Sequence, residues 1–315
     1  LTNRETEKLF QIIKDLKSKG KSFIYVSHRM EEIFEICDRV TVLRDGKYIG
    51  SENIENITYH DLVRMMVGRK IENLIPYEKY QKGKEVLRVE DLAITNEFYD
   101  VSFSLYENEV LGFFGLMGSG RSEIMHAIFG SKKLSKGYIY IDNEEIKIKS
   151  PRDAKKHGIA FVTEDRKSEG LILDFNIVEN VLLPSYKDRS NKGIVDEKLN
   201  VNISKEKIEQ LNIKTSSEKQ KLRNLSGGNQ QKVVFAKWLE TNPRIFILDE
   251  PTRGVDVGSK KEIYTLINYL KANGAAIILV SSELPEVIGI SDRIAVMHNN
   301  RLVKIIDDRN NFNEE

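Results

Sequence analysis

Two stretches of the chain, near its beginning and near its end, repeat one pattern of hydrophobic and polar positions. In each stretch apolar residues recur at the spacing of an amphipathic helix, so each predicts a helix with one buried face. Each helix pattern ends at a glycine, Gly20 or Gly274, which suits a left-handed C-terminal cap, and a short apolar strand follows. The inward positions are Leu9, Ile12, Ile13 and Leu16 in the first helix and Ile263, Leu266, Ile267 and Leu270 in the second. Helix, strand, helix, strand is typical of the end of an α/β domain.

The two stretches align without a gap when the sequence is shifted by 254 positions, which places residues 1–50 over residues 255–304. Identical pairs include Ile13/Ile267, Leu16/Leu270, Gly20/Gly274, Val26/Val280, Ser27/Ser281, Glu32/Glu286, Asp38/Asp292 and Arg39/Arg293. We interpret the repeat as two tandem copies of one domain, of which this chain keeps the end of the first and all of the second. The expected plan is a C-terminal remnant of a first domain at 1–50, a charged connection at 51–85, a complete second domain at 86–305 and a polar tail at 306–315.

A glycine-rich loop follows the first buried strand pattern of the second domain. The apolar run "EVLGFFG" (109–115) leads into "GLMGSGRSE" (115–123), and helical spacing follows to residue 130. Such glycines let backbone amides turn inward and cradle phosphate oxygens at a helix N-terminus, and the Ser122 hydroxyl is placed to ligate magnesium. The expected nucleotide-binding residues are Gly115, Leu116, Met117, Gly118, Ser119, Gly120, Arg121, Ser122 and Glu123. A glycine turn that only joins strand to helix is the alternative.

Two adjacent carboxylates stand at the end of another buried strand pattern. In "PRIFILDEPTRGVD" (243–256) four apolar residues precede Asp249 and Glu250. Asp249 can hold magnesium through its water shell, and Glu250 can polarise the water that attacks a γ-phosphate. Taken alone, the pair could also be two solvated acids before a proline turn.

A third motif, "LSGGNQQ" (225–231), begins 24 residues before Asp249. With the phosphate loop before it and "ILDEP" after it, the chain closely resembles the ATP-binding-cassette ATPases. The runs "TEDRKSEGLILDFNIVENVLLPS" (163–185) and "LSGGNQQKVVFAKWL" look like the second cassette of the double-cassette ATPases that drive bacterial import of ribose, galactose, xylose and related solutes. The tandem repeat is what that subfamily would have.

The resemblance implies the fold, the cofactors and further site residues. The fold is an α/β P-loop NTPase of the ABC type, with a mostly parallel core sheet flanked by helices, an antiparallel β subdomain and a helical signature subdomain. The cofactors are ATP and Mg²⁺. Ser226, Gly227 and Gly228 would touch the γ-phosphate of ATP bound to an opposing domain. Nucleotide contacts are also assigned to Asn229, Gln230 and Asp256, and an aromatic ring, either Phe98 or Tyr99, would stack on adenine.

Departures from the family pattern predict a slow catalytic site. Arg121 replaces the lysine of the phosphate loop, and a planar guanidinium cannot act as a compact ammonium. Glu164 stands where the family has a glutamine that touches magnesium, and its carboxylate is still a possible metal ligand. His28 in the first copy matches the switch histidine, but Ser282 replaces it in the second. With Glu250, His28 and Ser282 as catalytic positions, we expect hydrolysis at least about 100-fold below that of a full site.

Charge and composition narrow the function further. Lys and Arg total 49 against 48 Asp and Glu, so the chain lacks the basic excess typical of nucleic-acid-binding proteins. Cys37 is the single cysteine, which excludes an internal disulfide, fits a reducing compartment and is expected as a small buried residue. No apolar run approaches the length of roughly 18 residues that a membrane span needs. Any membrane role must therefore pass through a partner.

The resulting functional prediction is the energy-coupling ATPase subunit of a monosaccharide importer. Its expected partners are integral membrane permease subunits, a solute-binding protein that acts through them, and the first cassette of the same polypeptide or a second copy. Its expected location is the cytoplasmic face of the cell membrane. One alternative is a soluble double-cassette ATPase that acts on ribosomes or DNA, although the short, mixed-charge connection and the single cysteine do not favour it. Another is a nucleotide-binding fragment without turnover of its own.

Overall fold

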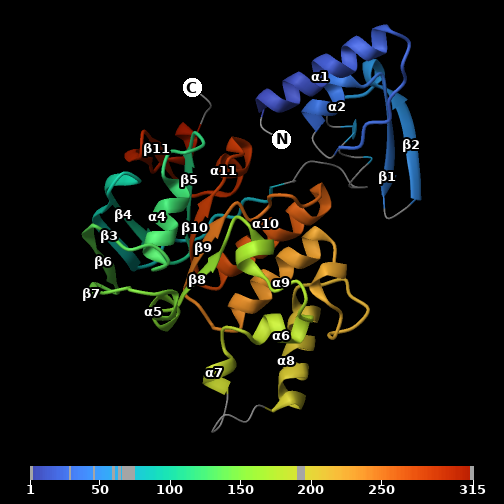
Figure 1. Cartoon of the computed structure of the whole chain (residues 1–315). Helices are drawn as coiled ribbons and strands as arrows, with labels where there is room; N and C mark the ends of the chain where they lie inside the picture. Colours follow the sequence, from blue (N-terminus) through green and yellow to red (C-terminus); the bar gives the residue numbers. More distant parts are fainter. Residues whose placement is uncertain are drawn as a thin grey trace. The chain divides into compact units, whose positions relative to one another are not determined.

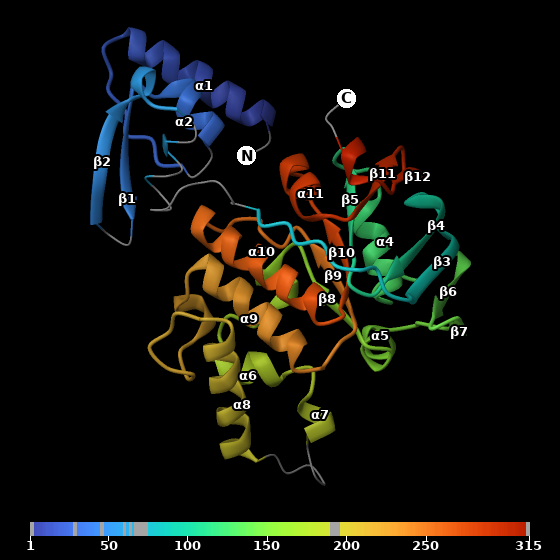
Figure 2. The same cartoon turned by 180° about the vertical axis from the view of Figure 1, so that it is seen from behind.

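The structure is a computed structural model that divides the chain into two compact units (Figures 1 and 2). One unit comprises Leu1–Leu74 with Asp256–Gly258, and the other comprises Ile75–Val255 with Ser259–Glu315. The division between Leu74 and Ile75 falls inside the segment 51–85 that was expected to connect two domains. The structure describes residues 3–27, 30–44, 47–58, 61–62, 65, 75–189 and 196–312.

The described residues of the smaller unit include two helices and a hairpin. Helix α1 (Asn3–Ser18) and helix α2 (Met30–Ile36) precede strands β1 (Arg39–Arg44) and β2 (Lys47–Asn53), which pair antiparallel, and a 3-10 turn η1 (Ile54–Asn56) follows. Two small clusters of buried residues hold the unit together, and Cys37 lies half-buried beside both. The clusters are Ile33, Val40, Val42, Ile57 and Leu62 in one and Phe10, Ile13 and Ile36 in the other.

The strand predicted after α1 is not formed, so that prediction is wrong for the first copy. Residues 21–27 have no regular structure, and the side chains of Ile24 and Val26 are 97% and 91% exposed. Ile12, predicted to face inward, is also 56% exposed, whereas its counterpart Leu266 packs against the core of the larger unit. Among the described residues of the smaller unit, β1 and β2 pair only with each other, so no strand pairs with residues 21–27, and a single unpaired strand is not stable in water.

The larger unit is built around a six-stranded sheet. Its order is β12-β11-β5-β10-β9-β8, in which all neighbours pair parallel except the edge strand β12. The strands are β5 (Val110–Gly115), β8 (Ile159–Val162), β9 (Ile245–Asp249), β10 (Ala276–Val280), β11 (Arg293–His298) and β12 (Arg301–Ile306). Strands β8, β9 and β10 are buried throughout, as parallel strands covered on both faces should be. The mostly parallel core sheet predicted from the sequence is confirmed.

A second, four-stranded sheet is antiparallel and has the order β4-β3-β6-β7. Its strands are β3 (Glu85–Ile94), β4 (Phe98–Tyr106), β6 (Lys136–Ile141) and β7 (Glu144–Ile146). This sheet and a group of helices lie on different sides of the core sheet (Figures 1 and 2). The group contains a single π turn η2 (Arg166–Gly170), α6 (Ile177–Leu182), α7 (Tyr186–Arg189), α8 (Glu197–Gln210), a 3-10 turn η3 (Leu222–Asn224) and α9 (Gly227–Leu239).

Local sequence signals set several helix ends. Helix α6 begins with a capping box, in which the Asn176 side chain and the Glu179 side chain each accept from the other's backbone amide. Ser150 caps α5 (Pro151–Lys156), which has proline at its first position. The remaining elements are α4 (Arg121–Ile128), α10 (Val257–Ala272), α11 (Leu284–Ile290) and the 3-10 turn η4 (Arg309–Asn311). Helices α4 and α11 pack against β5, so they lie beside the strand that leads into the glycine-rich loop.

The segment 75–80 is fixed to the larger unit by buried polar contacts. The Lys271 side chain is fully buried, and its Nζ donates to the Glu78 carbonyl and to Asp292 Oδ1, both at 2.7 Å. The Tyr77 hydroxyl donates to the same Asp292 oxygen at 2.9 Å, and burial beside this carboxylate raises the pKa of Tyr77 to about 12. In the first copy the equivalent Lys17 and Asp38 also pair, at 2.5 Å, but both side chains are exposed.

Candidate functional site

The glycine-rich loop connects β5 to α4 in a conformation that its glycines make possible. Gly118 and Gly120 have φ values of 79° and 90°, which side-chain-bearing residues rarely adopt, and Gly120 caps α4. A Cβ atom on Gly115 would lie 2.4 Å from the Met297 carbonyl oxygen, so this strand end also requires glycine. The buried Ser119 hydroxyl has no hydrogen-bond partner among the described residues. The loop has the backbone of a phosphate cradle at a helix N-terminus.

Arg121, the first residue of α4, points inward. Its side chain is buried, and Nη1 donates to the Ser281 carbonyl oxygen at 2.8 Å. Ser281 follows the last residue of β10, so the guanidinium joins the glycine-rich loop to the end of the neighbouring strand. The remaining N–H donors of the guanidinium are available to a phosphate, but as a planar fork and not as the compact point charge of a lysine ammonium.

Asp249 ends β9 as a carboxylate without a partner. Its side chain is 1% exposed, and neither oxygen has a partner with hydrogen-bond geometry among the described residues. Burial raises the pKa of Asp249 to about 7, although the nearby Ser122 hydroxyl and Arg121 lower it in part. An unpaired buried carboxylate beside a hydroxyl is a donor set that fits Mg²⁺, which prefers oxygen ligands. The described residues contain no cluster of three or more His, Cys, Asp or Glu side chains that could hold a metal ion.

Glu250 and Ser282, both predicted as catalytic, lie together at the ends of β9 and β10. The Ser282 hydroxyl donates to Glu250 Oε2 at 3.2 Å. Burial raises the pKa of Glu250 above its ordinary value, while Ser282 and Arg121 oppose the change. Glu250 also has a φ of 48°, a conformation that costs free energy in a residue with a side chain and that often accompanies function.

A buried carboxylate that the sequence analysis missed supports these two strand ends. Glu286 on α11 is 1% exposed and accepts hydrogen bonds from Thr252 Oγ1 at 2.9 Å and from Ser281 Oγ. It therefore joins the turn after Glu250 to the residue before Ser282. The sequence contained a signal for this contact, because Ser27/Ser281 and Glu32/Glu286 are identical pairs across the 254-residue shift. In the first copy, Ser27 likewise donates to Glu32 at 2.8 Å.

The motif 225–231 lies against the turn that follows Glu250. Ser226 caps α9, and its hydroxyl accepts from the Asn229 side chain at 2.9 Å. Gln230 is buried and donates to the Leu222 carbonyl at 3.0 Å, so its side chain holds the preceding turn. A Cβ atom on Gly227 would lie 2.9 Å from the Gly254 carbonyl oxygen, which shows how closely the two segments approach.

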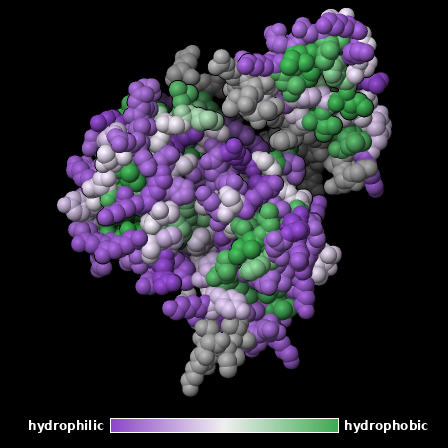
Figure 3. Space-filling view, viewed as in Figure 1, coloured by the Kyte–Doolittle hydropathy of each residue, from purple (hydrophilic) through white to green (hydrophobic). Residues whose placement is uncertain are grey.

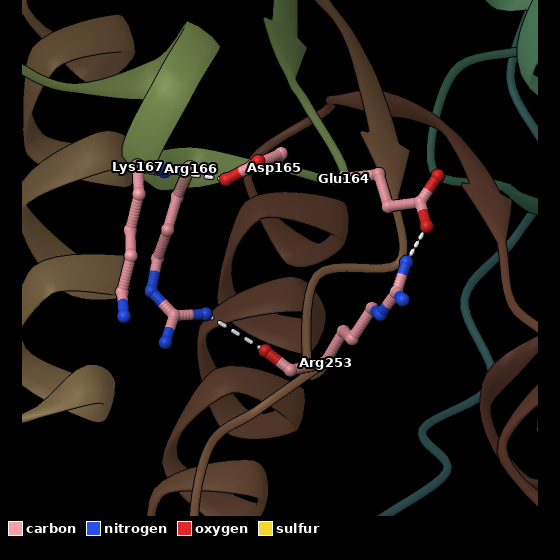
Figure 4. A pocket seen from close by; sticks show the side chains of 5 residues that line it. All are labelled: Glu164, Asp165, Arg166, Lys167 and Arg253. Atoms are coloured by element: carbon pink, nitrogen blue, oxygen red, sulfur yellow. Dashed lines mark hydrogen bonds and ion pairs between the residues drawn. The ribbon is translucent and has the colours of Figure 1, made fainter. Parts of the chain in front are cut away.

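The loop that carries Glu164 faces the same turn. Residues 164–167 and Arg253 line a cavity of about 260 Å³ (Figure 4). Glu164 and Arg253 form an ion pair whose side chains are 40% and 62% exposed. Glu164 is therefore engaged by an arginine, and its predicted role as a magnesium ligand requires that this pair open.

The other candidate residues are placed differently. Phe98 is fully buried, so of the two aromatic candidates Tyr99 alone has ring surface to present to a ligand. Asp256 is exposed and belongs to the residues 256–258 that are grouped with the smaller unit. His28 lies outside the described residues. Leu116 and Met117 are exposed on the glycine-rich loop.

Residues 98–253 match the model of a family described as ABC transporter. Relatives include the ribose import ATP-binding protein RbsA of Geobacillus kaustophilus, 52% identical over 98% of this chain and 62% of the relative. The protein of the same name from Bacillus subtilis is 49% identical over 96% of this chain and 61% of the relative. The chain thus spans about three fifths of the length of these relatives.

Solved ATP-binding cassettes have the same fold as the larger unit. A nucleotide-free cassette from an ABC transporter matches with a TM-score of 0.62 and 25% identity, over 70% of this chain and 91% of that chain. MJ1267, an ATP-binding cassette of an ABC transporter, matches with a TM-score of 0.63 and 26% identity, over 73% of this chain and 94% of that chain. The fold class predicted from the sequence is confirmed by these matches.

Proposed function

Since the chain contains a domain of the ABC transporter family, we propose that it binds and slowly hydrolyses ATP as the energy-coupling subunit of a sugar importer. One observation carries the proposal: Arg121, Asp249, Glu250 and Ser282 converge where the glycine-rich loop meets the ends of β9 and β10. The names of the relatives support ribose, or a similar monosaccharide, as the transported solute.

Each converging residue has a role in the proposed reaction. Amides of the glycine-rich loop bind the phosphates, and Ser122 and Asp249 would hold Mg²⁺, which neutralises phosphate charge when bound. Glu250 accepts a proton from the attacking water, and its raised pKa suits a general base better than that of an exposed glutamate. Ser282 orients the Glu250 carboxylate through the hydrogen bond at 3.2 Å.

The same geometry supports a slow site. The Arg121 guanidinium is held by the Ser281 carbonyl, and its planar, delocalised charge cannot follow the transferring phosphate as the compact ammonium of a lysine does. Ser282 contacts Glu250 itself, and its short hydroxyl reaches less far than an imidazole toward a γ-phosphate. An attacking water that neither residue holds in position should lower the hydrolysis rate at least about 100-fold.

Importer function requires partners in a membrane. No helix in the described part of the chain is long and apolar enough to span one. Hydrophobic residues gather on the surface near α6 (Figure 3), where Ile172, Phe175 and Leu183 are exposed. We assign this surface, with the Glu164 loop, to permease subunits that receive solute from a binding protein, and we place the chain at the cytoplasmic face of the membrane. A first cassette, or a second copy, would supply the opposing site.

The test is magnesium-dependent ATP turnover by the purified chain at increasing protein concentration, with Glu250→Gln as the matched variant. Turnover that rises with concentration and disappears in Glu250→Gln supports a site completed by two cassettes. If the chain binds ATP but its turnover stays at background, this site is regulatory and does not hydrolyse ATP. Failure to bind ATP in the presence of magnesium would overturn the proposal.

A further inference from the structure

Arg166 joins three segments that the proposed ATPase cycle uses: the Glu164 loop to which it belongs, the turn after Glu250 and the start of α9. It begins the π turn η2, directly after the Glu164 loop, and its side chain is 9% exposed. Its Nη1 donates to the Arg253 carbonyl oxygen at 2.7 Å, and its Nη2 donates to the Gly254 carbonyl oxygen at 3.1 Å. A planar guanidinium can reach two successive carbonyls in this way, whereas an ammonium offers one point of charge.

The third segment is the start of α9. A Cβ atom on Gly227 would lie 2.8 Å from Arg166 Nη2 and 2.9 Å from the Gly254 carbonyl oxygen. Gly227 therefore packs directly on the guanidinium and on the turn that Arg166 holds. A side chain at position 227 would force the three segments apart.

Local structure fixes Arg166 from its own side. The Asp165 carboxylate caps η2 and accepts from the amides of Lys167 and Ser168, at 2.9 and 3.3 Å. The Lys237 ammonium on α9 donates to the Gly170 carbonyl at 2.5 Å, which ties the end of η2 to the body of that helix. The π turn is thus held at both ends while Arg166 spans the space to residues 253 and 254.

We infer that Arg166 is a positioning residue that holds the first turn of α9 against the turn following Glu250. This inference rests on the proposed function, in which Ser226, Gly227 and Gly228 act on nucleotide bound to an opposing cassette. Through Arg166, any movement of the turn after Glu250 is passed to these residues. The Arg166 contacts therefore couple Glu250, the proposed general base, to the position of Ser226, Gly227 and Gly228, which face the opposing cassette.

A second arginine provides a matched control. Arg253 reaches back to Glu164, so each loop extends one arginine toward the other (Figure 4). This ion pair is exposed, and such pairs contribute about 0–1 kcal/mol. Arg253→Gln removes the ion pair but keeps the backbone carbonyl that accepts from Arg166. Arg166→Gln removes both charged hydrogen bonds, and Arg166→Lys restores one of them.

The experiment compares the full chain with Arg166→Gln, Arg166→Lys and Arg253→Gln by three measurements. They are the dissociation constant of a fluorescent ATP analogue, amide hydrogen exchange of residues 226–231, and the KM and kcat of magnesium-dependent turnover. Hydrogen bonds from a charged donor stabilise local structure by about 1.5–3 kcal/mol. We therefore expect Arg166→Gln to speed amide exchange at residues 226–231 about tenfold or more. We expect Arg166→Lys to recover part of the protection, Arg253→Gln to leave it unchanged, and nucleotide affinity to stay within about twofold in all three.

The outcomes separate this inference from the proposed function. Unchanged exchange in Arg166→Gln, or equal acceleration in Arg253→Gln, would overturn the positioning role. Where wild type turns over ATP, Arg166→Gln should lower kcat about tenfold with KM unchanged, and an increase in KM alone would also contradict the inference. If wild type fails to bind ATP, the proposed function is wrong, while the exchange comparison still decides whether Arg166 positions α9.

Discussion

Asp249→Asn is expected to stabilise the nucleotide-free chain at pH 8 while it abolishes magnesium-dependent nucleotide binding. Burial raises the pKa of Asp249 from 3.8 to about 7. One pKa unit corresponds to about 1.4 kcal/mol, so ionised Asp249 destabilises the folded chain by up to about 4 kcal/mol. Asparagine removes the charge but leaves a buried amide that costs about 1–3 kcal/mol, so the expected net gain is roughly 1–3 kcal/mol.

The pH dependence of this effect has a definite sign. The pKa of Asp249 is higher in the folded chain than in the unfolded chain, so the folded chain holds the extra proton between the two values. The free energy of unfolding of wild type therefore falls as pH rises from about 4 to about 7, and the loss is complete above that range. The advantage of Asp249→Asn should shrink by roughly 2–3 kcal/mol when the comparison is made at pH 5 instead of pH 8.

The assay is urea unfolding at pH 5 and pH 8 in the presence of a chelator. Glu206→Gln, a change at an exposed carboxylate on α8, is the control and should alter the free energy of unfolding by less than about 0.5 kcal/mol. Adding ATP with magnesium at pH 8 should stabilise wild type and Glu206→Gln but not Asp249→Asn. A lower stability of Asp249→Asn than of wild type at pH 8, or an equal advantage at both pH values, would contradict a pKa of Asp249 raised by burial.

Variants at three further places test the site and the helix α9 beside it. Arg121→Lys combined with Ser282→His should raise magnesium-dependent turnover at least about tenfold, and an unchanged rate would contradict the assignment of slow hydrolysis to these positions. Glu286→Ala removes the acceptor for Thr252 and Ser281, so steady-state assays should find kcat about tenfold lower with little change in KM, and Glu286→Gln should lose less. Burial lowers the pKa of Lys237 to about 8, below its value of 10.5 in an unfolded chain, so wild type gains stability from pH 8 upward. In urea unfolding, Lys237→Met should remove this rise of stability with pH and should be more stable than wild type near pH 7 by up to about 3 kcal/mol. A Lys237→Met variant less stable than wild type at pH 7 would contradict this expectation.

The motifs and the core sheet were predictable because each depends on a short continuous stretch of sequence. A buried strand followed by the glycine-rich loop and a helix fixed the place of residues 115–122, and another buried strand delivered Asp249 and Glu250. Since β5, β9 and β10 run parallel, their carboxyl ends meet at one edge of the sheet. This is why Glu250 and Ser282, 32 residues apart, lie in contact.

The contacts that join the motifs could not be predicted in the same way. Arg166 lies 88 residues from Gly254 in sequence, and no local pattern marks one arginine of a charged loop as buried. The strand predicted at residues 21–27 failed for a related reason. Its apolar sequence matches that of β10, but β10 is stabilised by β5 and β9 on either side, and sequence periodicity does not report whether such neighbours are present.

The repeat separates what side-chain identity determines from what the surroundings determine. Lys17 pairs with Asp38 and Lys271 pairs with Asp292, so the same residues at the same spacing form the same ion pair. The first pair is exposed and should contribute about 0–1 kcal/mol. The second lies beneath residues 75–80, where loss of one partner would leave a buried charge at a cost of about 3–5 kcal/mol. The repeated sequence therefore predicts which residues pair, but the contribution of each pair depends on segments that lie outside the repeat.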